Sequence, residues 1–139
     1  MFLSSKSITE SIEKGSLSIT PFSIENLKPA SYMFTIGSIL IDSLSIEETP
    51  IPEQGYILKP QSFILAQTKE SINLHNNFIC ILGTRSSLAQ KGVDALQTST
   101  IAEPDTNGPF MLEIINHGSQ DIILTIDMPI VKGIFCPIN

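Results

Sequence analysis

The chain has 139 residues, a formal net charge of −6 and only 16% charged residues. This length fits a single domain, residues 1–139, that can bury a core of its own. The apolar content of 42% leaves room for a subunit interface as well. The acidic balance argues against non-specific nucleic-acid binding and against an anionic membrane surface. No apolar run could span a bilayer, and residues 1–6 lack a signal-peptide pattern.

The cysteines and histidines carry no metal-binding or redox pattern. Cys80 and Cys136 both lie in apolar surroundings, which favours two buried free thiols in a cytoplasmic protein over a disulfide. His75 and His117 are far apart, and we expect each in a turn or on the surface. No CxxC, HxE or HExxH spacing occurs, so we expect no metal bound by protein ligands.

The first predicted element is a short helix at residues 4–15, where a serine can cap the start, Ile8 and Ile12 lie one turn apart, and Gly15 can end the helix. Short runs typical of β-strands follow, with Pro, Gly and Asn between them, at residues 32–41, 55–58, 62–68, 78–82, 110–115, 121–126 and 130–135. Many short strands predict an all-β sandwich or barrel. Asn107-Gly108 favours a tight hairpin turn.

Residues 83–92 contain the only arginine of the chain, Arg85, followed by Ser86 and Ser87. A helical turn is predicted from there to Lys91, capped by one of the serines and ended by Gly92. Such a turn suits an anion such as phosphate, with the arginine as a bidentate partner. The alternative is an ordinary capped turn whose arginine pairs with a surface carboxylate.

The order and spacing of several segments resemble the dCTP deaminase branch of the dUTPase superfamily. Its G-[KR]-S-S-L-x-R-x-G, I-D-P-G and L-E-[LFI]-x-N segments are matched by residues 83–92, by Glu103-Pro104 and by residues 112–116. N-terminal segments agree as well, so the resemblance covers nearly the whole chain. It implies a distorted β-barrel of the jelly-roll type with a short N-terminal helix and one short helical turn, assembled as a homotrimer with active sites between subunits.

The same resemblance implies a zinc-independent enzyme that converts dCTP to dUTP and ammonia, with Mg²⁺ carried by the nucleotide. Glu113 would be the general acid and base, and Ser86 would help to hold the attacking water. The remaining positions would contact the phosphates (Arg85, Ser86, Ser87 and Gln90) or the pyrimidine (Gln97, Thr98 and Ser99).

Glu113 also stands out by its surroundings, because it is the only charge in the apolar run of residues 110–115. Burial there would raise its pKa toward the range useful for proton transfer. The alternative is a glutamate on the exposed face of an edge strand.

Four departures from the family pattern qualify this interpretation. Gln90 replaces an arginine and keeps a donor without the charge. Glu103 replaces the hairpin aspartate that activates water in dUTPases, and Asp105 replaces the following glycine. Met33 and Thr35 replace an Asp and an Arg, a pair that a fold can lose together. Family members also carry a tail that closes over the phosphates, so we expect another chain to supply this lid, or a smaller ligand that needs none.

Three functions therefore remain open from the sequence. The first is a deaminase acting on a deoxycytidine nucleotide. The second is a catalytically impaired paralogue that acts as a nucleotide-binding, regulatory or interaction module. The third is a dUTP pyrophosphatase, which Glu103 disfavours.

Overall fold

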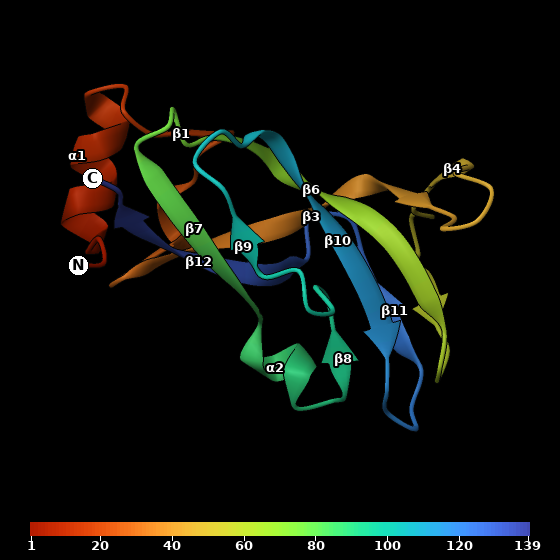
Figure 1. Ribbon diagram of the computed structural model, residues 1–139. Helices are drawn as coiled ribbons and strands as arrows, with labels where there is room; N and C mark the ends of the chain where they lie inside the picture. The colour runs from red at the N-terminus through yellow and green to blue at the C-terminus, as the bar shows by residue number, and fades with distance from the viewer.

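The computed structural model describes all 139 residues, and strands dominate it (Figure 1). A ten-stranded sheet has the central order β8-β10-β6-β3-β12-β7-β9, with β1 added to β6 and with β2 and β4 added to β3. A separate two-stranded sheet joins β5 and β11. The strands are β1 (Ser18–Thr20), β2 (Leu27–Lys28), β3 (Ser31–Ile41), β4 (Glu48–Pro50), β5 (Tyr56–Leu58), β6 (Phe63–Asn73), β7 (Phe78–Thr84), β8 (Val93–Asp94), β9 (Ile101–Ala102), β10 (Asn107–Asn116), β11 (Ile122–Leu124) and β12 (Pro129–Pro137). The predicted mainly-β fold is confirmed.

Strand β3 joins the two halves of the sheet because it changes partner along its length. Its first half pairs with β12, and from Ile36 onward it pairs with β6, with a register shift between Ile36 and Leu40. Gly37 lies at this shift, where an added Cβ would come within 3.1 Å of the Gln67 carbonyl oxygen. The sheet therefore curls around its core instead of lying flat.

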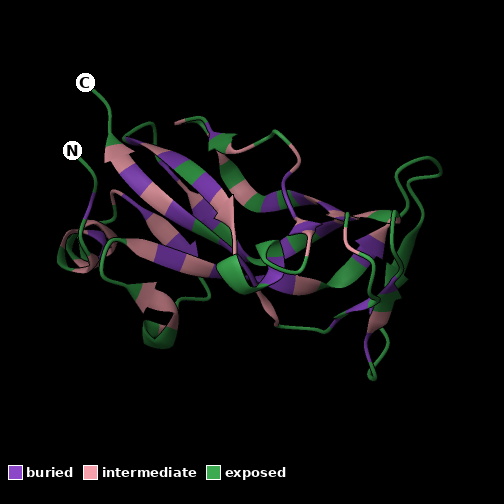
Figure 2. Cartoon of the chain, turned by 90° about the horizontal axis from the view of Figure 1, so that it is seen from below, coloured by how far each residue is buried: buried purple, intermediate pink, exposed green.

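Alternation along the long strands decides which side chains form the core. Buried and exposed residues follow one another in bands on the ribbon (Figure 2), most regularly along β6 and β10. Tyr32, Phe34 and Phe110 meet edge-to-face in the core, with ring centroids 5.2 and 5.1 Å apart. Such aromatic contacts stabilise the core beyond the area they bury.

The predicted N-terminal helix is confirmed as α1 (Ser5–Glu13). The Ser4 hydroxyl accepts a hydrogen bond from the Ser7 N–H at 3.2 Å, Ile8 is fully buried, and Gly15 adopts a φ of +77°. A short 3-10 turn, η1 (Ile24–Asn26), precedes β2. No helix of the structure combines the length and the hydropathy that a bilayer crossing requires.

The expected hairpin at Asn107-Gly108 is wrong. Asn107 opens strand β10 and pairs with Asn73 of β6. The turn lies just before it, where the Thr106 N–H donates to the Glu103 carbonyl at 3.0 Å. Pro104 and Asp105 are the central residues of this turn, and proline suits such a position because its φ is already restricted.

The two cysteines differ in exposure. Cys80 is fully buried, and burial raises the pKa of its thiol. Cys136 is only half-buried, so the expectation that both thiols are buried is wrong for this residue. It lies near the end of β12, opposite Ile79 of β7.

Glu70 is a buried carboxylate that is held by one residue. Its oxygens accept hydrogen bonds from the Thr35 N–H at 2.8 Å and from the Thr35 hydroxyl at 2.7 Å. Only 3% of Glu70 is exposed, and no cation lies within ion-pairing distance of it, since the one ion pair of the chain joins Lys69 and Asp127. Thr35 therefore satisfies a carboxylate at the position where the resemblance places an arginine.

We expect Thr35→Val to lower the free energy of unfolding by about 2–3 kcal/mol, because a hydrogen bond to a buried charged group is lost without a change of shape. Denaturant titration measures the loss. Thr35→Ser is the control, since it keeps the hydroxyl and should lose only about 1 kcal/mol for the missing methyl group. An equal loss of unfolding free energy in both variants would mean that the Thr35 hydroxyl does not stabilise the Glu70 carboxylate.

Candidate functional site

Arg85 opens onto a hollow of about 800 Å³ between α2 (Ser86–Ala89) and the loop of residues 117–121. Ser87, Gln90 and Lys91 line the same side of it as Arg85. No carboxylate lies within ion-pairing distance of Arg85, because the one ion pair of the chain lies elsewhere. The alternative of an arginine paired with a surface carboxylate is therefore wrong.

The local structure of α2 explains why these side chains are available. Arg85, not a serine, occupies the N-cap position, so the predicted serine cap is wrong. The Arg85 carbonyl accepts from the Leu88 and Ala89 N–H groups, both at 3.0 Å. Both serines lie in the first turn, where N–H groups have no partner within a helix. Neither serine hydroxyl is used by the cap.

The opposite wall of this hollow was not predicted from the sequence. It includes Ser119, Gln120 and Asp121. Asn116, which is fully buried, shapes this loop: its amide donates to the Gln120 carbonyl at 2.7 Å and its oxygen accepts from the Gly118 N–H at 2.9 Å. An asparagine at the end of an apolar strand, two residues before a glycine, is the signal that could have indicated it.

Two glycines bring this loop against the end of α2. An added Cβ on Gly92 would lie 2.7 Å from the Gly118 nitrogen, and one on Gly118 would lie 2.4 Å from the Lys91 carbonyl oxygen. Neither position can accept a side chain without movement of the backbone. Both glycines line the Arg85 hollow, so this contact holds its two walls together at that point.

Glu113 lines a second, smaller hollow of about 390 Å³, together with Ser99, Glu103 and Asp105. It lies on β10, which pairs with β6 on one side and β8 on the other, so the alternative of an edge strand is wrong. Its backbone N–H donates to the Ala95 carbonyl at 2.8 Å.

The carboxyl group of Glu113 is poorly solvated on one side. The side chain as a whole is half-buried, but Oε1 is buried and has no hydrogen-bond partner. Burial raises the pKa of Glu113, and the nearby charge of Asp94 raises it further. The expected direction of its pKa shift is confirmed.

Within one chain the predicted residues do not converge on a single hollow. Arg85, Ser87 and Gln90 line the first hollow, Ser99 and Glu113 line the second, and no residue lines both. The remaining three predicted residues, Ser86, Gln97 and Thr98, line neither.

Gln97 and Thr98 form a turn beside the Glu113 hollow. The Ser99 N–H donates to the Leu96 carbonyl at 2.9 Å, and Gln97 has a φ of +50°. Leu96 forms an isolated bridge with Glu113, which anchors the turn to β10. The backbone of this turn is thus positioned relative to the Glu113 carboxyl by main-chain bonds.

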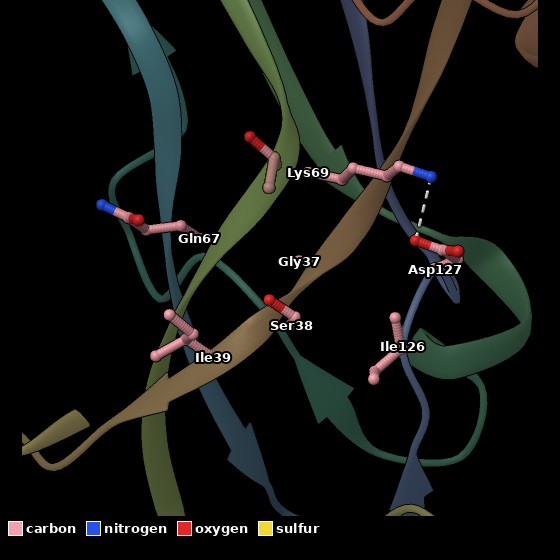
Figure 3. Close-up of a pocket in the computed structure, with 8 residues that line it drawn as sticks. Gly37, Ser38, Ile39, Gln67, Lys69, Ile126 and Asp127 are labelled. Atoms are coloured by element: carbon pink, nitrogen blue, oxygen red, sulfur yellow. Dashed lines mark ion pairs between the residues drawn. The ribbon is translucent and has the colours of Figure 1, made fainter. Parts of the chain in front are cut away.

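A third hollow, of about 300 Å³, opens where β3 and β6 separate at their register shift (Figure 3). Lys69 and Asp127 form an ion pair of 3.1 Å at its edge. None of the predicted site residues lines it. His75 and His117 are exposed turn residues, and no group of three His, Cys, Asp or Glu side chains is arranged to hold a metal ion.

A family model described as dCTP deaminase-like matches residues 2–136. The chain belongs to the dCTP deaminase-like family. Among curated relatives, a "dCTP deaminase, dUMP-forming" of Methanospirillum hungatei is 26% identical over all of this chain and 86% of its own length. The dCTP deaminase of Buchnera aphidicola is 36% identical over 63% of this chain and 46% of its own length.

Solved structures agree on the fold. The deoxycytidine triphosphate deaminase of Agrobacterium tumefaciens superposes with a TM-score of 0.81 at 17% identity, over 99% of this chain. This chain spans 48% of that protein's length. The dUTPase of Streptococcus mutans superposes with a TM-score of 0.56 at 16% identity, over 89% of this chain and 96% of its own. The family match and the curated relatives together support a dCTP deaminase-like function.

We expect Glu113→Gln to raise the melting temperature by a few degrees at pH 7 and by nothing near pH 4. A folded-state pKa above the unfolded value stabilises the protein at low pH, and this contribution is lost as the pH rises through the folded pKa. The glutamine side chain is neutral at every pH, so the variant does not lose this stability as the pH rises. Thermal melts across this pH range measure it.

Glu10→Gln on the exposed surface of α1 is the control for this experiment. An increase that is equal at both pH values, or absent at both, would contradict a desolvated Glu113.

Proposed function

We propose that this protein catalyses the hydrolytic deamination of a deoxycytidine nucleotide, dCTP to a uracil nucleotide and ammonia. The observation that carries the proposal is the Glu113 carboxyl: one oxygen is shielded and unbonded, in a hollow beside the Gln97–Ser99 turn. The family match over residues 2–136 supports the same reaction.

Glu113 would act on the water that attacks the pyrimidine C4. Its carboxylate takes a proton from that water, and the carboxylic acid then passes the proton toward the departing amino group, which leaves as ammonia. A raised pKa suits the first step, because the carboxylate is then a stronger base toward the water. The backbone of the 97–99 turn would read the pyrimidine edge, and Ser86 would help to hold the water.

The phosphates would lie in the hollow of Arg85. The guanidinium of Arg85, the hydroxyl of Ser87 and the ammonium of Lys91 line this hollow and supply donors and two positive charges. Ser86 does not line the hollow, but it directly follows Arg85 in the chain and would add a second hydroxyl to the phosphates. Gln90 adds a neutral donor. A triphosphate brings more negative charge than this set neutralises, so Mg²⁺ would arrive bound to the nucleotide.

A homotrimer would complete the site. The phosphate donors and Glu113 line different hollows of one chain, so a neighbouring copy would have to bring its Arg85 hollow to the Glu113 of the first. Phe63, Met111 and Ile115 lie on the same open sheet face as Glu113 and offer apolar surface for that contact. We place this assembly in the cytoplasm, in keeping with two free thiols.

A second candidate, nucleotide binding without turnover, rests on Gln90. This side chain is exposed and faces the Arg85 hollow, yet it carries no charge to offset that of a phosphate. A thermal-shift panel of pyrimidine nucleotides with Mg²⁺ detects binding whether or not turnover follows. A shift without ammonia release would favour this candidate.

The identity of the product is a separate question that Glu103 raises. Its carboxylate lines the same hollow as Glu113, and some relatives are named as forming dUMP. Separation of dUTP from dUMP among the products by anion-exchange chromatography answers it, and also tests hydrolysis of dUTP itself.

We expect Glu113→Gln to reduce ammonia release from Mg²⁺-dCTP by about 10²–10⁴-fold, the usual contribution of a general acid–base group. A coupled ammonia assay with a fold check by melting measures this. Lys6→Gln, an exposed substitution on α1, should leave the rate unchanged. Undiminished turnover in the glutamine variant would exclude Glu113 from the chemistry.

We expect Gln90→Arg to lower the KM for Mg²⁺-dCTP several-fold, because it adds a bidentate cation to the phosphate hollow. Initial-rate kinetics at fixed Mg²⁺ measure the effect. Gln120→Arg adds the same charge on the opposite wall of the same hollow, so it separates the effect of the position of the cation from the effect of its charge. An equal gain in both variants would mean that only the net charge matters.

A further inference from the structure

Asp94 lies on the same face of the sheet as Glu113. It is directly opposite Ile115 in the antiparallel pair of β8 and β10. Residues that face each other across such a pair point to the same side, and so do residues two apart on one strand. Asp94 and Glu113 are therefore diagonal neighbours on one face, within reach of each other's side chains.

The Asp94 carboxyl group is held in place by the backbone. Its Oδ1 accepts a hydrogen bond from the Leu96 N–H at 2.9 Å, and the Ala95 N–H between them donates to the Thr84 hydroxyl at 3.0 Å. The Ala95 carbonyl accepts from Glu113 itself. Residues 94–96 thus connect the Asp94 carboxyl group to the backbone of Glu113.

The charges around Glu113 are all negative. Asp94 faces it from β8, and Glu103 and Asp105 face the same hollow from the β9–β10 turn. From β6, Leu65 is directly opposite Glu113. Lys69, the only cation on that strand, is bonded to Asp127, and Arg85 and Lys91 line the other hollow.

We propose that Asp94 is a positioning residue for Glu113. The negative charge of Asp94 favours a proton on the Glu113 carboxyl in the resting site, and the pair thereby sets the pH at which the site works. This inference rests on the proposed deaminase function. The shielded, unbonded Oε1 of Glu113 favours the neutral, protonated carboxyl, because an ionised oxygen there is shielded from solvent and has no donor. The direction of the Glu113 pKa shift and its second cause agree.

The pair has a consequence for catalysis. A carboxyl that holds its proton more strongly is a better base toward the attacking water, but it is available as a base only at higher pH. Removal of the Asp94 charge should therefore shift the acid limb of the kcat/KM profile to lower pH and reduce the maximal rate above it.

The test is a titration of Glu113 by carboxyl-carbon NMR in the full chain, with the signal assigned by its loss in Glu113→Gln. Asp94→Asn keeps the size and the acceptor for Leu96, and Asp94→Ser keeps a hydroxyl acceptor if the first variant folds poorly. We expect either variant to lower the Glu113 midpoint by about half a unit to one unit. An unchanged midpoint in a folded variant would overturn the proposal.

Asp42→Asn is the matched control, because Asp42 also accepts a backbone N–H two residues on, from Leu44 at 2.9 Å, but lies in the β3–β4 loop. A shift of the Glu113 midpoint that is as large in this control would also overturn the proposal.

The pH profile of kcat/KM for Mg²⁺-dCTP tests the role of Asp94 and the proposed deaminase function separately. A parallel shift of its acid limb supports both the pair and the deaminase. A shifted Glu113 midpoint without ammonia release supports the pair and rejects deamination, whereas turnover with an unmoved acid limb keeps the deaminase and rejects the role of Asp94.

Discussion

The placement of β10 between β6 and β8 is the constraint on which the candidate site depends. Pairing on both sides fixes which face of β10 is buried, so that Leu112 and Ile114 enter the core and Glu113 faces the other way. A register slip by one residue would exchange these faces and bury the charge. The same pairing carries Asp94 to its place beside Glu113 and positions the 97–99 turn.

The Arg85 hollow depends on a different set of contacts at the end of that strand. Asn116 closes the 117–121 loop, and Gly92 and Gly118 bring the loop against α2 without room for side chains. Strand β10 thus lines the hollow of Glu113, while its last residue, Asn116, only holds the loop of the Arg85 hollow, and the two hollows remain separate. This separation is what makes assembly part of the proposed function, because donors for the phosphates and the acid–base group come from different surfaces of the chain.

Much of the fold could be predicted from the sequence because the information is local. A capping serine and two isoleucines one turn apart are enough to predict α1, and apolar alternation predicts the long strands. The errors also have local causes. Asn107-Gly108 favours a turn by residue type, but pairing of Asn107 with β6 outweighs its turn propensity. Residue type favours a serine as the α2 cap, whereas the path of β7 into the helix places Arg85 there.

The sequence by itself determined the strand-rich class and the family resemblance, and it indicated Glu113 as a candidate acid–base group, since these depend on residue type and spacing. Only the tertiary structure decided that β10 is an inner strand, that Glu113 has a shielded and unbonded oxygen, and that Asp94 faces it. It also decided that Ser119, Gln120 and Asp121 complete the Arg85 hollow. The physical reason is that solvation and charge proximity arise between segments far apart in the chain, and no local pattern of residues encodes the distance between them.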